Sequence, residues 1–247
     1  MSLSDAPASG LRDVAPFPVP AEQHPAGTGH HELRARLLRA GREAVDDREL
    51  LQLLLAGSHP AAEAERLATV LLDTFGTPAR VLAARTDTLR TVAGLGDAGI
   101  AAIRTAEALS IAMAKAALPD TFHPQLATYE KVVEYCRTLA AHREVEELHV
   151  LFLNTKNALI RDEVHQRGTV KHTPVYPRQV CVRALELQAS SLVLVHNHPS
   201  TDPTPSRADV EMTARLRDAL KTIDVDLHDH IVVTSGAAFS FKEKGLL

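Results

Sequence analysis

The spacing of apolar residues divides the chain into two halves. From Glu32 to about Ala117, leucine and valine recur at steps of three and four residues, which places them on one face of successive helices. The groups are Leu33, Leu37 and Leu38, then Leu50, Leu51, Leu54 and Leu55, then Leu67, Val70 and Leu71. This pattern predicts an all-helical domain over residues 31–117.

The second half alternates short apolar runs with helical patterns. Such alternation is typical of a mixed sheet covered by helices. The expected helices span 128–141, 177–187 and 206–220, and the expected strands span 147–153, a second run through 164, 191–195 and 230–234. The fold class is therefore α+β, with the helical domain followed by a mixed-sheet α/β domain over residues 128–247.

Two segments show neither the helical nor the strand spacing of apolar residues. Residues 1–30 hold five of the 14 prolines and cannot bury enough apolar surface to order themselves, so we expect a disordered tail. Residues 118–127 include Pro119 and Pro124 and are expected to form a linker.

Composition narrows the class of protein. A chain of 247 residues with 45% hydrophobic content is long enough for a packed core, which excludes wholesale disorder. The net charge of −4 argues against a protein that holds nucleic acid by a broad excess of positive charge. Cys136 and Cys181 are too few for a disulfide scaffold or a Cys-rich zinc site. With neither an export signal nor a membrane-spanning run, we expect a soluble, cytoplasmic protein.

The candidate chemistry follows the apolar run that ends at Val195. The next residues are His196-Asn-His198-Pro199, and side chains two apart on a strand share a face, so both imidazoles can converge. After a proline-rich turn, Ser206 and Asp209 begin a helix, and this carboxylate could supply a third ligand. Two His and one carboxylate with an open position form the ligand set of a catalytic zinc site. The alternatives are a structural H-x-H and a helix-capping box at S-x-x-D.

The combined spacing is more restrictive than its parts. H-x-H, seven residues, Ser, two residues and Asp resembles the JAMM metalloprotease motif of MPN-type domains, and HNHPSTDPTPSRAD resembles its bacterial RadC branch. The resemblance runs from about Glu32 to Leu247, and Thr201 stands where that family has Gly. It implies zinc held by His196, His198 and Asp209, with Ser206 donating to the developing oxyanion.

A JAMM site also needs a glutamate upstream as general base. Glu163 is the preferred candidate, because it lies on a strand that runs into Gly168, as the family glutamate does. The other interpretation of Glu163 is a solvent-facing strand residue. Glu186, in a helix, is the second candidate.

Other histidines offer weaker signals. His228-Asp-His230 repeats the H-x-H spacing without a following Ser-x-x-Asp, so we expect Asp229 and His230 to be structural or to support the ligands from behind. His165 and His172 flank Gly168 and are expected in exposed loops, with a place in the cleft as the alternative.

In the helical half, Val92-Ala-Gly94-Leu-Gly96-Asp97 resembles the hairpin of helix-hairpin-helix modules, which brings backbone N–H groups to a phosphate. Acidic and basic residues balance in this half, and Arg104 is the only nearby cation. A packing turn is therefore favoured over DNA contact.

The leading functional hypothesis is a zinc-dependent hydrolase of JAMM type that cleaves a peptide or isopeptide bond in a protein or peptide substrate. The alternatives are a DNA-associated repair or recombination factor of the RadC family and an inactive metal-bound scaffold.

Overall fold

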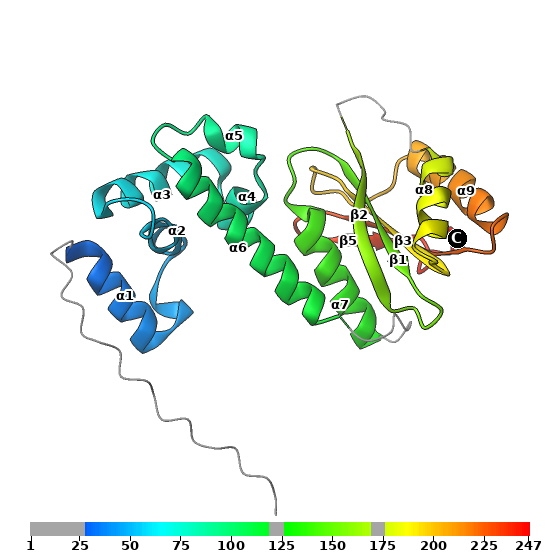
Figure 1. Ribbon diagram of the computed structural model, residues 1–247, viewed down its shortest axis with the longest axis horizontal. Coiled ribbons are helices and arrows are strands. Elements are labelled where there is room, and N and C mark those ends of the chain that lie inside the picture. The colour runs from blue at the N-terminus through cyan, green and yellow to red at the C-terminus, as the bar shows by residue number, and fades with distance from the viewer. Residues whose placement is uncertain (1–27, 119–125, 169–175) are drawn as a thin grey trace, which may run out of the picture.

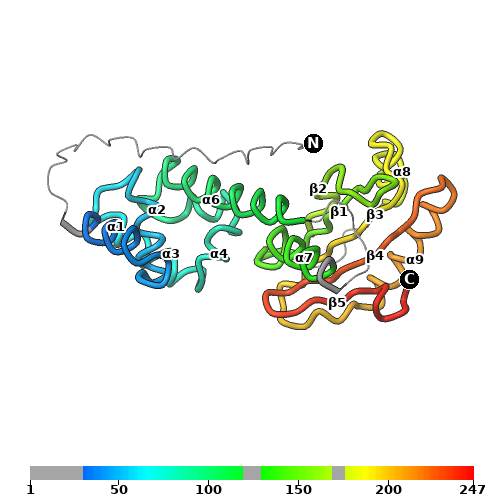
Figure 2. The backbone as a smooth tube through the Cα atoms, turned by 90° about the horizontal axis from the view of Figure 1, so that it is seen from below, coloured from blue at the N-terminus to red at the C-terminus, as the bar shows by residue number. Residues whose placement is uncertain are grey.

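The computed structural model describes residues 28–118, 126–168 and 176–247 (Figure 1). Helices gather at one end of the molecule, a sheet with its own helices forms the other, and α6 extends from the first toward the second (Figures 1 and 2). The α+β class and the order of its two parts agree with the sequence prediction. The predicted tail and linker lie almost wholly outside the described residues.

The helical part packs its elements around one apolar cluster. Its elements are α1 Thr28–Ala40, the 3-10 turn η1 Arg42–Ala44, α2 Asp47–Leu55, α3 Ala61–Phe75, α4 Pro78–Ala83, α5 Thr86–Arg90 and α6 Gly96–Ala116. Leu55, Leu67 and Leu71 are fully buried, as their helical spacing predicts. Helix α2 begins with a capping box in which Asp46 and Glu49 satisfy each other's backbone N–H groups.

The sheet part contains five strands among the described residues. Its elements are α7 Leu126–Cys136, its π-helical continuation η2 Arg137–Ala141, β1 Glu147–Leu153, β2 Leu159–Arg167, α8 Pro177–Glu186, β3 Ser191–Asn197, α9 Arg207–Lys221, β4 Asp226–Val233 and β5 Ala238–Ser240. The strand order is β2-β1-β3-β4-β5, and only the β3–β4 pair is parallel. The central position of β3 places its last residues between β1 and β4.

Every residue of β1 is buried, because the sheet is covered on both faces. Leu151 and Leu153 join the core under α7, whereas Val150 and Phe152 join the core under α8 and α9. The two layers of helices lie on opposite sides of the strands (Figure 2). This explains why the sequence of β1 is a nearly continuous apolar run.

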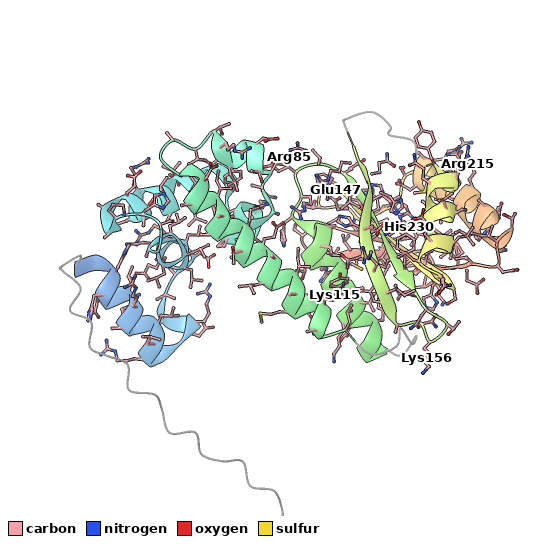
Figure 3. All side chains as sticks on the ribbon, in the orientation of Figure 1. Arg85, Lys115, Glu147, Lys156, Arg215 and His230 are labelled. Carbon is pink, nitrogen blue, oxygen red and sulfur yellow. The ribbon has the colours of Figure 1, made fainter. Side chains whose placement is uncertain are left out.

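Partly buried and exposed ion pairs connect the helical part to the sheet part. Arg143, which precedes β1, lies 2.7 Å from Glu107 of α6 and donates a 3.0 Å hydrogen bond to the carbonyl of Ala83. Its Nε is also 3.8 Å from Glu147, whose side chain is 7% exposed. A second ion pair joins Lys115 of α6 to Asp162 of β2 at 2.8 Å, and Figure 3 marks both Lys115 and Glu147 on the facing sides of the two parts. The two parts are therefore held together by specific polar contacts.

Several details differ from the sequence prediction. Helix α1 begins at Thr28, inside the predicted tail, and α7 begins at Leu126, inside the predicted linker. The three-residue strand β5 was not predicted. Both cysteines are free, and burial raises the pKa of the Cys136 thiol, which suits a residue packed in the core. Among the described residues, no helix combines the length and the apolar character needed to cross a bilayer.

Replacing Arg143 by Ala should lower the free energy of unfolding by about 2–3 kcal/mol, because Glu107 and Glu147 each lose one ion-pair partner and the Ala83 carbonyl loses its donor in a largely buried place. Urea denaturation followed by circular dichroism measures the change. The control is Arg207→Ala, whose ion pair with Glu211 is exposed and should contribute less than about 0.5 kcal/mol. Equal losses in the two variants would show that the connection between the parts adds no stability.

Candidate metal centre

The two histidines of H-x-H lie together at the end of β3. His196 pairs with Leu148 of β1 and with Val232 of β4, and the chain leaves the sheet directly after Asn197. The imidazoles of His196 and His198 meet edge to face with their centroids 4.9 Å apart. Their side chains are 11% and 13% exposed, so both are near the surface but largely shielded.

Helix α9 brings Asp209 to this pair. Oδ1 of Asp209 lies 3.3 Å from Nδ1 of His196, and Oδ2 lies 3.6 Å from Nε2 of His198. Ligand bonds of about 2.0–2.1 Å in a tetrahedral site separate neighbouring donor atoms by about 3.3 Å. The two distances from the Asp209 carboxylate to the imidazoles are therefore close to the separation expected between donors that share one zinc ion.

Ser206 determines where Asp209 points. It is the N-cap of α9, and both its backbone N–H and its hydroxyl donate 2.7 Å hydrogen bonds to Oδ2 of Asp209. The Asp209 N–H returns a 3.2 Å bond to the hydroxyl oxygen, which completes a capping box. The capping and ligand interpretations of S-x-x-D are thus compatible, because the cap leaves Oδ1 facing His196.

The electrostatics favour an ionised Asp209. Burial opposes its charge, but the close imidazoles and the Ser206 hydrogen bonds outweigh burial and hold its pKa well below the ordinary value. The same carboxylate raises the pKa of His198.

The nitrogens of the two imidazoles are free to act as ligands. Nδ1 of His198 lies 3.1 Å from the Asp202 carbonyl, so an Nδ1–H donated there leaves the lone pair on Nε2, which faces Asp209. Nδ1 of His196 is buried and makes no hydrogen bond with the described residues. A buried ring nitrogen of this kind, facing a carboxylate, is the environment expected of a metal ligand.

A fourth side chain at the centre is Glu146, which the sequence analysis missed. It immediately precedes β1, and its Oε2 lies 3.9 Å from Nε2 of His196. One ligand atom from each of Glu146, His196 and His198 falls within 4.8 Å of the others, which is close enough to hold a metal ion. The signal that could have located it is strand pairing, because β1 beside β3 puts the start of β1 next to the end of β3.

Glu163, the expected base, lies elsewhere. Glu163 of β2 pairs with Val150 of β1, which in turn pairs with Leu194 of β3, two residues before His196. Two strand spacings and two residues along the strand put the Cα atoms of Glu163 and His196 about 12 Å apart. Its carboxylate accepts hydrogen bonds of 2.6–3.0 Å from Arg183 of α8, and this contact lowers its pKa. Glu186 also binds Arg183, at 2.8 Å. The structure therefore pairs both candidate glutamates with the same arginine, Arg183.

Asp229 has a structural position. It accepts a 2.6 Å hydrogen bond from the Ser240 hydroxyl and a 3.0 Å bond from the Lys242 N–H, so it fastens the segment of β5 to β4. Burial raises its pKa. The expectation of a structural role fits these contacts.

His230 is fully buried behind the centre, in the middle of the sheet part (Figure 3). Its Nδ1 lies 2.7 Å from the Thr213 hydroxyl, which donates a 2.6 Å bond to the Asp209 carbonyl. The ring also lies parallel to that of His196, with centroids 6.2 Å apart. His230 thus supports the turn of α9 that carries Asp209.

Two further histidines, His165 and His172, were expected in exposed loops. His165 lies on β2 with a side chain 13% exposed and its ring 5.7 Å from Phe152, so the expected exposed loop position is wrong. His172 falls outside the described residues.

Comparison with known proteins agrees with the fold. Residues 126–246 match the family model described as the RadC-like JAB domain. A UPF0758 protein of Ruegeria pomeroyi is 46% identical over 215 residues, which cover 87% of this chain and 95% of that protein. A UPF0758 protein of Rhodobacter capsulatus is also 46% identical over 215 residues, 87% of this chain and all of that protein. The sheet part is thus a JAB domain, and the chain belongs to the RadC family.

Acid should destabilise the protein partly through His230. Burial lowers its pKa to about 3, whereas an unfolded His titrates near 6.5, so between these values only the unfolded state takes up the proton. The stability contribution of the neutral ring is complete above about pH 6.5 and is lost as the pH falls toward 3. His230→Phe should reduce the slope of unfolding free energy against pH, between pH 6.5 and 4, by up to about 1.4 kcal/mol per pH unit. An unchanged slope in urea titrations would contradict this assignment.

Proposed function

We propose that this protein is a zinc-dependent hydrolase that cleaves a peptide or isopeptide bond. The observation that carries the proposal is the convergence of two imidazoles and an ionised carboxylate beside a second, largely exposed carboxylate, that of Glu146. Membership of a JAB-type family, which includes hydrolases, supports the reaction class.

His196, His198 and Asp209 would hold the ion. Zinc in such a site acidifies a coordinated water and polarises a substrate carbonyl. The buried Nδ1 of His196 supports the assignment, because it faces Oδ1 of Asp209 at 3.3 Å without making a hydrogen bond, and two facing acceptors are costly unless a cation lies between them.

Glu146 is the residue we propose as general base. Its side chain is 60% exposed and lies next to His196, so it can take a proton at the centre and release it to a leaving group. We prefer Glu146 to Glu163, because three hydrogen bonds from Arg183 already engage the Glu163 oxygens.

Ser206 remains the proposed donor to the oxyanion. Oδ2 of Asp209 accepts from the Ser206 N–H as well as from its hydroxyl, each at 2.7 Å. The hydroxyl can therefore turn toward a substrate while the backbone N–H keeps the carboxylate satisfied.

The contacts of the glycine hairpin favour packing over DNA binding. A Cβ at Gly94 would lie 2.5 Å from Oε1 of Glu63 and 2.7 Å from Nη2 of Arg66, so the glycine permits a close approach to α3. Arg104 contacts Glu107 at 2.9 Å and the Leu82 carbonyl, and is thus engaged within the helical part. The hairpin therefore gives DNA no cluster of free cations among the described residues.

Metal analysis tests the ligand set. His196→Ala and Asp209→Ala should each lose most of the zinc that the wild-type protein carries after purification, because each removes one of three protein ligands. His228→Ala is the matched control, since it alters the other H-x-H segment and should retain zinc. Equal zinc in all four proteins would defeat the assignment.

Two glutamine variants test the base. In a peptide-library cleavage assay, Glu146→Gln should lower the rate by at least about 100-fold while zinc stays bound, because a neutral amide cannot accept the proton. Glu163→Gln should retain hydrolysis within about threefold, since that residue serves Arg183. Full activity of Glu146→Gln would remove this residue from the mechanism.

A further inference from the structure

Asn197 lies between the two histidines, and its side chain is buried on the opposite face of the sheet. The Asn197 side chain is 0% exposed, and alternation along β3 turns it away from the face that carries His196. Its Oδ1 accepts a 2.7 Å hydrogen bond from the Glu147 N–H, and its Nδ2 donates a 3.0 Å bond to the Val145 carbonyl. One carboxamide thus binds the backbone on both sides of Glu146.

Glu146 needs such backbone support. Its side chain is 60% exposed, so packing does little to fix its position. Besides Asn197, the Gly168 N–H donates a 2.7 Å bond to the Glu146 carbonyl. Contacts of Arg167 and His149 with Glu147, at 3.2 and 3.1 Å, fix the neighbouring side chain on the far side. The backbone at Glu146 is therefore held at fixed points while its carboxylate stays accessible.

We propose that Asn197 is a positioning residue, whose carboxamide holds the backbone around Glu146 so that its carboxylate stays beside His196. The inference rests on the proposed function, in which Glu146 is the base. It adds a reason for the residue type at the centre of H-x-H, because the same short segment then supplies two metal ligands and places the base.

The two hydrogen bonds are of opposite polarity, and this limits which side chains can make both. An amide offers an acceptor and a donor at one end of a short side chain, and it carries no charge to be buried. A hydroxyl at the same place is too short to reach both backbone groups. Asn197→Ala removes both bonds, and Asn197→Thr keeps a polar atom in a residue that suits a strand.

The first test is the visible spectrum of the Co²⁺-substituted full-length protein at one fixed pH, because absorption by tetrahedral Co²⁺ reports the ligands and the groups that contact them. Glu146→Gln should shift the bands with Co²⁺ still bound at one ion per chain. Asn197→Ala should shift them in the same direction, and the double variant should match Glu146→Gln alone, since Asn197 acts through Glu146.

The second test is kinetic. With a peptide that the wild type cleaves, Asn197→Ala should lower kcat by about 10- to 100-fold and change KM by less than about twofold. The matched control is Asn154→Ala, because Asn154 also binds two backbone N–H groups, at 2.9 and 3.0 Å, but at the other end of β1. Its spectrum and kcat should equal those of the wild type. Asn197→Thr replaces Asn197→Ala in both tests if circular dichroism shows that the alanine variant is unfolded.

The outcomes separate the two proposals. A wild-type protein that binds no Co²⁺ overturns the metal centre and this inference together. If Co²⁺ binds and Glu146→Gln shifts the spectrum, an Asn197 variant with wild-type bands and kcat overturns the inference alone. Shifts from Asn197 and Glu146 that add in the double variant also overturn it, because they would mean that Asn197 acts by another route.

Discussion

The contact between Asp209 and the two imidazoles is the constraint on which the centre depends. A carboxylate that is 12% exposed loses most of its hydration, and it must regain that stabilisation from partners fixed by the fold. Two of these partners come from the end of β3 and one from the N-cap of α9. The packing of α9 on the sheet, through Leu216 and Leu220, is therefore what brings the polar groups together.

The local part of this arrangement could be predicted from the sequence, because it depends on short-range geometry. Alternation along a strand places His196 and His198 together, and a capping signal marks where Asp209 enters a helix. The span of β1 was predicted to the residue for a similar reason, since its run of apolar side chains is nearly continuous.

The position of Glu146 could not be predicted in the same way. It depends on the pairing of β1 with β3, some fifty residues apart in the chain, and no local pattern specifies that pairing. Glu163 was preferred because it shares a strand context with the family glutamate, but its environment is determined by Arg183, which arrives from α8. Strand β5 was missed because three residues are too few for a period, and buried contacts with Asp229 fix it instead.

The two ion pairs of Arg143, with Glu107 and with Glu147, matter when the helical part and the sheet part are separated. The family model covers the sheet part alone, yet Arg143 divides its guanidinium between Glu107 and Ala83 of the helical part and Glu147 of β1. An excised JAB domain would free that cation to turn entirely toward Glu147, one peptide unit from Glu146. The helical part thus influences how much positive charge Arg143 places beside Glu147. A chimera that combines the sheet part of one relative with the helical part of another would keep this distribution of charge only if both parts came from the same protein.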